Sequence, residues 1–483
     1  MTIILTFIVN SFLNFVLGLA LAKFLGPDDF GRYAIAMAFA VLVNSVMFDW
    51  IRLSTARFYS EKVRAEQPAL RGTLDFLVAC MSFATFGLLA AAVLAGVDFR
   101  VPTALACAAT VAGLCMALFD FGATLTRARF LDRSYSLLVI VKNIAAFILM
   151  VGGAWITDDP LVVLIGSALS SMASLLLARR VLHDHGADLT KPDWTLAKQF
   201  ALYGLPLMAA NMFYQLITFM NRAMIADAYG YAEAGQFALA TDMGIRIFAT
   251  LGSALDIFLF QVAVRADEQN GRAHADQQLS RNMSLVLALC APLAAGYWLA
   301  LPMFEALIVP ADYRGHFAAY STILIPAMFC YALVLYALNP VFQIQKRTWP
   351  VIGAAFIAVI VNAIFAKTIA PSLGPSGFAW AQFAGYSAAL VMVFVASLVL
   401  SNVRPALGDV LRIVAATALM TLCVWPLRDL PPGIFKLALI VALGGAIYVG
   451  MALALNIADG RSILRDRLAA RKAGAGRALF TDR

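Results

Sequence analysis

Long apolar segments recur along the whole chain, and no other feature restricts its possible folds as strongly. A transmembrane helix needs about 20 predominantly apolar residues, and segments of this length follow one another from end to end. Hydrophobic residues make up 62% of the chain and charged residues only 13%. Soluble domains do not have this composition. The sequence therefore predicts an all-α polytopic membrane protein with 14 transmembrane helices. The predicted spans are 3–25, 32–51, 73–96, 103–125, 135–156, 160–178, 201–228, 236–262, 283–309, 318–344, 350–369, 378–400, 407–427 and 434–456.

An internal repeat groups the first twelve spans into two sets. Gly26 and the segment 31–36 are matched by Gly230 and the segment 235–240, at a constant offset of 204 residues. Both segments follow the pattern Gly-x-aromatic-Ala-aliphatic-Ala. Duplications of this kind build transporters, so we expect two six-helix lobes and a C-terminal helix pair. The predicted parts are 1–200 (N-terminal lobe and cytoplasmic linker), 201–402 (C-terminal lobe), 403–458 (last two helices) and 459–483 (basic tail).

Polar side chains share one face of the span 201–228, where helical spacing places them together. They are Asn211, Tyr214, Gln215, Thr218, Asn221 and Arg222. The next span carries a second polar arc formed by Asp242, Arg246, Thr250, Ser253 and Asp256. The repeat aligns Ser11 with Gln215 and Asn14 with Thr218. Because charge in a membrane span normally faces a bundle interior or a water-filled cavity, we predict a cavity whose substrate-binding residues are Arg222, Arg246, Asn211, Tyr214, Gln215, Thr218, Asn14 and Ser11.

The intramembrane charges have alternative interpretations as ion pairs. Asp242 and Arg246 stand at i and i+4, so they either neutralise each other or serve the cavity. Arg222 has its nearest acid, Asp227, at i+5 and off its face, which favours a cavity role.

Two further acids complete this set. Asp120 and Lys142 lie at similar depth in neighbouring helices, so a structural pair is expected, with a cavity role for Lys142 as the alternative. Asp256 is assigned to pairing or coupling in the same way.

The basic residues indicate topology and not nucleic-acid binding, despite a net charge of +8. They concentrate in alternate connections and in the tail, as the positive-inside rule requires of cytoplasmic segments. Both termini are therefore expected in the cytoplasm. The opposite connections are short and hold only Arg32, Arg100, Arg314, Lys367, Arg428 and Lys436.

The sequence offers no pattern for catalysis, metals or cofactors. All six cysteines lie in apolar segments, as expected of packed thiols, and no nucleophile–base pair or phosphate-binding loop stands out. No basic residue precedes the first apolar run, so a cleavable signal peptide is not expected.

Several segments resemble the bacterial polysaccharide (O-antigen-type) flippases of the multidrug/oligosaccharidyl-lipid/polysaccharide exporter superfamily. The similar segments are 25–34, 230–240, 310–320, 345–348 and 373–381. The resemblance implies two lobes around an alternating-access cavity lined by helices one, two, seven and eight. It implies as cargo an oligosaccharide on a polyprenyl pyrophosphate, moved from the inner to the outer leaflet of the bacterial inner membrane for surface polysaccharide synthesis. Many family members carry an acid where this chain has Asn221, so ion coupling is not expected there.

This interpretation also implies partners: lipid-linked oligosaccharide, membrane lipid, and a polysaccharide polymerase and glycosyltransferases acting beside the transporter. One alternative keeps the fold and makes the chain an ion-coupled drug/cation antiporter, which favours acidic cavity residues. The other is a membrane glycosyltransferase, polymerase or ligase. Such an enzyme needs a large outward loop for its active site, whereas the outward connections here are short.

Overall fold

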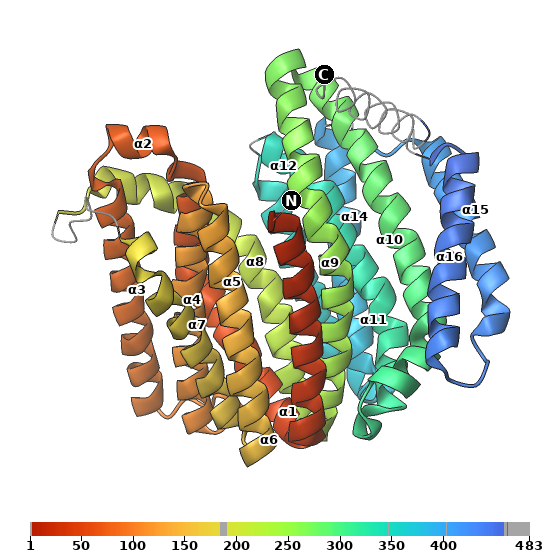
Figure 1. Cartoon of the computed structure of the whole chain (residues 1–483), viewed down its shortest axis with the longest axis horizontal. Coiled ribbons are helices and arrows are strands. Elements are labelled where there is room, and N and C mark those ends of the chain that lie inside the picture. Colours follow the sequence, from red (N-terminus) through yellow and green to blue (C-terminus); the bar gives the residue numbers. More distant parts are fainter. Residues whose placement is uncertain (1, 184–190, 346, 402, 458–460, 462–483) are drawn as a thin grey trace, which may run out of the picture. The chain divides into compact units, whose positions relative to one another are not determined.

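The computed structural model describes residues 2–183, 191–345, 347–401, 403–457 and 461, with no side-chain description for residues 2–9, 11, 61, 62, 65, 253, 254, 256–258 and 270. The described chain is helical and without strands (Figure 1). It forms two compact units, Met1–Thr250 with Val309–Met328 and Lys346–Val393, and Leu251–Ile308 with Phe329–Gln345 and Phe394–Arg483. The residue boundaries of the lobes inferred from the repeat stay a prediction.

The helices of the first half are long enough to cross a bilayer, apart from short segments between them. Their bounds are α1 Thr2–Phe58, α2 Glu61–Glu66, α3 Ala69–Leu94, α4 Thr103–Ala128, α5 Asp132–Ala146, the π-helix η1 Phe147–Val151, α6 Gly152–Thr157, α7 Pro160–Leu182, α8 Trp194–Tyr229 and α9 Tyr231–Asn270.

The second half continues in the same way. Its bounds are α10 Arg272–Ile308, η2 Ala311–Tyr313, α11 His316–Leu333, the π-helix η3 Val334–Leu338, α12 Asn339–Ile344, α13 Trp349–Thr368, η4 Ala370–Leu373, α14 Gly377–Ser401, α15 Leu407–Val424, η5 Trp425–Leu427 and α16 Ile434–Ala454.

Twelve helices are long and apolar enough to span a membrane, counted over the described residues. One of them, 12–58, contains the first two predicted spans, and α9 covers the eighth predicted span outside those twelve. These helices account for the 14 predicted spans.

The first two spans are joined without a loop. α1 runs through Gly26 and Pro27, where Gly26 has φ +69° and a non-helical ψ of 174°. Gly230, its equivalent in the repeat, has φ +91° and ends α8. Glycine adopts positive φ without the steric cost that a Cβ brings. Both copies therefore break their helical geometry and turn at the same residue, since the ψ of Gly230 is 168°.

Helix α8 begins at Trp194, seven residues before its predicted span of 201–228. Asp193 caps it, because its Oδ1 accepts hydrogen bonds from the amides of Thr195 (2.8 Å) and Leu196 (3.3 Å). Trp194 is thus the first residue of α8.

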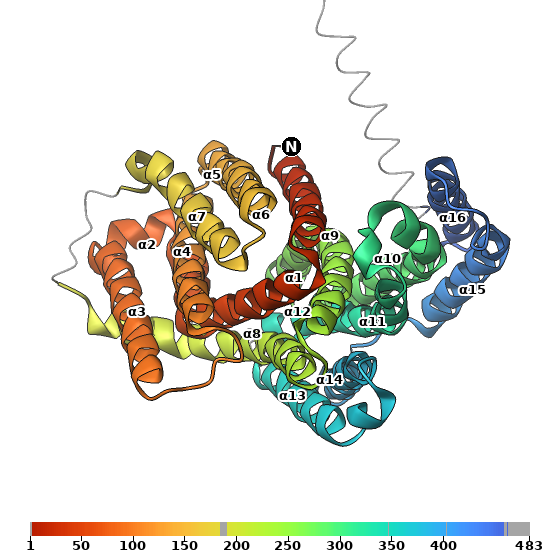
Figure 2. The same ribbon diagram turned by 90° about the horizontal axis from the view of Figure 1, so that it is seen from below.

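The first unit is built around α1, which packs against α8 on one side and α4 on the other (Figure 2). Large apolar side chains of α1, α3, α4 and α8 form its principal hydrophobic cluster, which includes Phe48, Leu74, Phe121 and Phe200. A smaller cluster joins α4, α5 and α7 through Tyr135 and Leu138. Both copies of the repeated segment therefore belong to the first unit.

In the second unit, α15 and α16 pack on α10 through an apolar cluster that includes Met303, Ile413 and Ile440. At one end of this cluster, the guanidinium carbon of Arg428 lies 3.7 Å from the ring centre of Trp298. Cation–π contacts of this kind attach a charged side chain to an aromatic surface. The predicted C-terminal helix pair is therefore anchored to a helix of its own unit.

Candidate functional site

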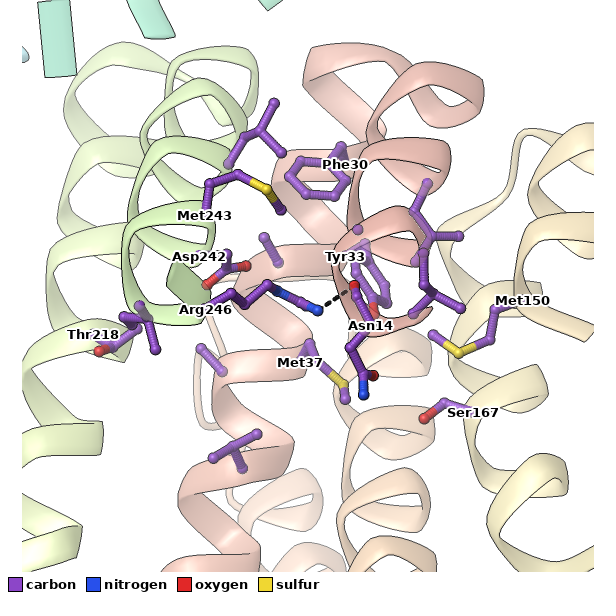
Figure 3. Close-up of a pocket in the computed structure, with 18 of the residues that line it drawn as sticks. Asn14, Phe30, Tyr33, Met37, Met150, Ser167, Thr218, Asp242, Met243 and Arg246 are labelled. Carbon is purple, nitrogen blue, oxygen red and sulfur yellow. Dashed lines mark hydrogen bonds between the residues drawn. The ribbon is translucent and has the colours of Figure 1, made fainter. Parts of the chain in front are cut away.

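A cavity of about 280 Å³ lies within the first unit, between α1, α4, α5, α7, α8 and α9 (Figure 3). Most of its wall is apolar, from residues such as Leu21, Met116 and Met243. Its polar lining residues are Asn14, Tyr33, Lys142, Ser167, Gln215, Thr218, Arg222, Asp242 and Arg246. The lining includes five of the eight substrate-binding residues predicted from the sequence, so the polar faces of the repeated helices do meet at one hollow.

Arg222 is held by an ion pair with Asp242 of the next helix. Its Nη1 also donates a hydrogen bond to the backbone oxygen of Ala34 at 3.0 Å, and its side chain is only 5% exposed. The prediction that Arg222 lacks an acidic partner was therefore wrong, as was the pairing of Asp242 with Arg246. Asp227, the acid nearest Arg222 in sequence, instead lies 2.8 Å from Arg100. Packing of α8 beside α9 decides these partners.

Arg246 crosses from α9 to α1, where its Nη1 donates to the backbone oxygen of Asn14 (Figure 3). Among the described residues it has no carboxylate within ion-pair distance. A carbonyl oxygen accepts a hydrogen bond from a guanidinium but does not neutralise it. Arg246 therefore brings an uncompensated positive charge to the cavity.

Lys142 of α5 is a further cation in the cavity lining. The predicted Asp120–Lys142 ion pair is not among those formed by the described residues. Asp120 accepts a hydrogen bond from Asn44 Nδ2 at 3.1 Å, and Lys142 Nζ lies 5.6 Å from the ring centre of Phe119 while lining the cavity. Asp120 and Lys142 still interact electrostatically, although their direct contacts differ. Three cations and one carboxylate give this cavity lining a net charge of +2.

The predicted polar face of α8 divides in two. Gln215 and Thr218 line the cavity with Arg222, whereas Asn221 is fully buried and exchanges amide hydrogen bonds of 3.0 and 2.9 Å with Asn362. Tyr214 is buried with its ring 6.1 Å from that of Tyr386. These two residues thus face α13 and α14.

Three predicted site residues are not placed in the cavity. Asn211 is partly buried on α8 but is not in the cavity lining. The side chains of Ser11 and Asp256 lie outside the described residues.

Two asparagines beside the cavity escaped the sequence analysis. Asn10 Oδ1 accepts hydrogen bonds from Asn14 Nδ2 at 2.9 Å and from Asn143 Nδ2 at 2.5 Å. This row of amides connects α1 to α5 directly beside Lys142. The signals in the sequence were the i, i+4 spacing of Asn10 and Asn14 and an Asn next to an intramembrane Lys.

Comparisons with known proteins agree on both family and fold. A family model described as polysaccharide biosynthesis protein matches residues 20–309, more than half of the chain. A search of curated protein sequences gives no significant match.

Among solved structures, lipid II flippase MurJ in an inward closed conformation is similar, with a TM-score of 0.74 and 14% identity over 95% of this chain and 99% of that one. A multidrug resistance MATE family transporter of the MOP superfamily is similar in its inward-facing form, with a TM-score of 0.52 and 15% identity over 83% of this chain and 96% of that one. An outward-facing structure of a multidrug resistance MATE family transporter gives a TM-score of 0.51 and 16% identity over 86% of this chain and 94% of that one. The predicted fold class is confirmed.

Proposed function

Because this chain belongs to the polysaccharide biosynthesis protein family and has a transporter fold, we propose that it flips an oligosaccharide linked to a polyprenyl pyrophosphate from the inner to the outer leaflet. The chain is a multi-pass membrane transporter and not an enzyme. The observation that carries the proposal is the cavity between the repeated helices, because its lining has a net charge of +2 inside an otherwise apolar protein.

A glycan headgroup cannot cross the hydrocarbon core unaided, because its hydroxyl and phosphate groups would lose water without replacement. Arg246 and Lys142 offer that replacement to the pyrophosphate, since charge-assisted hydrogen bonds to phosphate are the strongest available. Arg222 contributes less than its charge suggests, because Asp242 neutralises it. The net charge of +2 on the cavity lining matches the charge of a dianionic group.

Neutral polar groups beside these cations suit the sugar. Gln215 and Thr218 on α8 and Asn14 on α1 line the same cavity, and amide and hydroxyl groups both donate and accept hydrogen bonds. Asn211 and Ser11 stay predictions as further sugar contacts, whereas Tyr214 is buried against Tyr386 outside the cavity lining. Recognition of pyrophosphate by cations and of sugar by amides would let one cavity hold the entire headgroup.

Rocking of the two predicted lobes against each other would expose the cavity alternately to each side, as in transporters with repeated halves. An anionic headgroup that leaves a negative interior gains about 2.3 kcal/mol per charge per 100 mV when its charge crosses uncompensated. The membrane potential would then favour outward flipping without a nucleotide.

The direct test reconstitutes purified protein in vesicles that contain a lipid-linked oligosaccharide pyrophosphate. Headgroups that reach the other leaflet are detected by a membrane-impermeant glycosidase. We expect wild type and Lys142→Arg to flip, and Arg246→Ala and Lys142→Ala to slow flipping strongly. Normal flipping by the double variant Arg246→Ala/Lys142→Ala would contradict the assigned roles. No flipping by wild type in either membrane orientation would contradict the function itself.

The rival antiporter makes the opposite demand on the cavity. A drug/cation antiporter binds its cargo with acids, whereas a cavity lining with a net charge of +2 repels cationic dyes. We therefore expect no efflux of a cationic dye driven by an ion gradient in the same vesicles. Measurable efflux that Asp242→Asn abolishes would favour the antiporter.

The proposal also fixes a location and partners. We place the chain in the bacterial inner membrane with both termini in the cytoplasm, because the basic residues lie in the connections on that side. Glycosyltransferases would supply its cargo, and a polysaccharide polymerase would consume the product. A fluorescent-protein fusion at the C-terminus should fluoresce, and an alkaline phosphatase fusion there should be inactive; the reverse would refute the orientation.

A further inference from the structure

The two copies of the repeat touch each other at their turns through a reciprocal glycine contact. A Cβ atom built on Gly31 would lie 1.9 Å from the backbone oxygen of Tyr231, and one built on Gly235 would lie 2.1 Å from the backbone oxygen of Pro27. At the offset of 204 residues, Tyr231 is the equivalent of Pro27 and Gly235 that of Gly31. The same contact is therefore made twice, once from each copy, and only glycine fits either side of it.

This contact stands at one end of the cavity. Phe30 and Tyr33, the neighbours of Gly31 on α1, line the cavity, as does Leu239, one turn after Gly235 on α9 (Figure 3 labels Phe30 and Tyr33). Backbone atoms in van der Waals contact leave no passage for a solute between them. The cavity is thus closed on the side of the connection between α8 and α9, which the sequence predicts to face outward.

Polar contacts surround the glycines on the same side. The guanidinium carbon of Arg32 lies 4.9 Å from the ring centre of Tyr231, and the Tyr231 hydroxyl donates to the backbone oxygen of Arg100 at 3.1 Å. Arg100 also forms the ion pair of 2.8 Å with Asp227. Arg32 and Arg100 belong to the predicted N-terminal lobe, and Tyr231 and Asp227 to the C-terminal one.

These observations differ in weight. Arg100 and Asp227 are 50% and 46% exposed, and exposed ion pairs contribute little because water and salt screen them. Backbone contact through two glycines is insensitive to both. The glycines therefore decide whether the two turns meet, and the polar groups add a smaller bias.

We propose that the Gly31–Gly235 contact is the outward gate of the cavity and that Arg100, Asp227 and Tyr231 form a latch across it. Opening to the outside requires the two turns to separate, and this separation breaks both the glycine contact and the latch. The gate is independent of the cargo, so it holds whether or not the substrate proposed above is the right one.

The first test measures access from outside without any substrate. In a background with the six native cysteines replaced (Cys80, Cys107, Cys115, Cys290, Cys330 and Cys423), Thr218→Cys places a thiol in the cavity for a membrane-impermeant maleimide. Gly31→Ala and Gly235→Ala should each raise the labelling rate in intact cells at least about tenfold, a shift of about 1.4 kcal/mol toward the open state.

Gly87→Ala is the matched control, because a Cβ there meets nothing within 4 Å, and should leave the rate unchanged. Well-folded Gly31→Ala protein labelled at the wild-type rate would overturn the proposal.

The second test holds the gate shut and does not depend on the glycine variants folding. Arg100→Cys and Asp227→Cys, joined by a short bifunctional thiol reagent, should abolish outside labelling of Thr218→Cys, and reduction of the link should restore it. Persistent labelling of the fully cross-linked protein would show that the cavity opens elsewhere.

Discussion

The two copies of the repeated segment share a backbone and differ in charge. Arg222, Asp242 and Arg246 of the second copy correspond to Gly18, Ala38 and Leu42 of the first. The second copy therefore supplies the charged side chains.

The first copy provides backbone oxygens that accept hydrogen bonds from the two arginines. Arg222 donates to the backbone oxygen of Ala34, and Arg246 to that of Asn14. Duplication thus preserved the turn and its glycines while the two halves took complementary roles, one as donor and one as acceptor. The following variants test that division, from the largest expected effect to the smallest.

Arg222→Ala should have the largest effect. It gives the second copy the small residue that the first has at Gly18, but leaves Asp242 without a cation in a membrane protein interior. Losing one partner of a buried pair costs about 3 kcal/mol or more, and Asp242, at 30% exposure, belongs at the lower end. Thermal unfolding in detergent measures the loss. The double variant Arg222→Ala/Asp242→Ala should recover part of it; a double variant no more stable than the single would refute the pairing.

Arg246→Ala should affect binding more than stability. Removing one charge-assisted contact of about 2 kcal/mol should weaken affinity for the pyrophosphate-linked substrate about 30-fold. The control is Leu42→Ala, the equivalent change in the first copy, for which we expect little change in affinity. Equal effects of the two variants in a titration with fluorescent substrate would show that the copies are not specialised.

Asn221→Leu tests a polar difference that the cavity does not use. The first copy has Leu17 at this position, whereas the second buries an amide that pairs with Asn362. An unsatisfied Asn362 should cost about 1.5 kcal/mol of unfolding free energy. Asn221→Leu/Asn362→Leu should regain most of it in a chemical denaturation series. If the single and double variants are equally stable, the amide pair has no energetic role.

Arg100→Ala should have the smallest effect. Its partner Asp227 replaces Lys23 of the first copy, and the pair is about half exposed. We expect a loss of about 0.5 kcal/mol that disappears in high salt. A larger, salt-independent loss would mean that the pair is desolvated in the working state.

Much of the fold was predictable from apolar length, because a bilayer accepts few alternatives to a helix. The turn after the first span follows from the glycine at position 26, whose φ is positive and whose ψ is extended, like those of Gly230. The repeat placed that turn correctly in both copies.

The charge partners were not predictable in the same way. Sequence spacing reveals an i, i+4 neighbour such as Arg246 for Asp242, but the actual partner, Arg222, lies on the preceding helix. Finding it requires the crossing geometry of α8 and α9. Asn10 and Asn143 were missed for a related reason, since the hydrogen bond that joins them spans two helices and is not visible in the spacing of either one.

The attachment of both arginines to main-chain oxygens of α1 has an evolutionary consequence. Every residue type presents the same carbonyl, so positions 14 and 34 can exchange side chains without loosening the guanidinium grip. The side chains of α1 that line the cavity can therefore change during evolution to suit a new sugar, while the hydrogen bonds of Arg222 and Arg246 are kept. Substitutions at position 34 would then not correlate with those at position 222, nor substitutions at 14 with those at 246, although each pair is in direct contact.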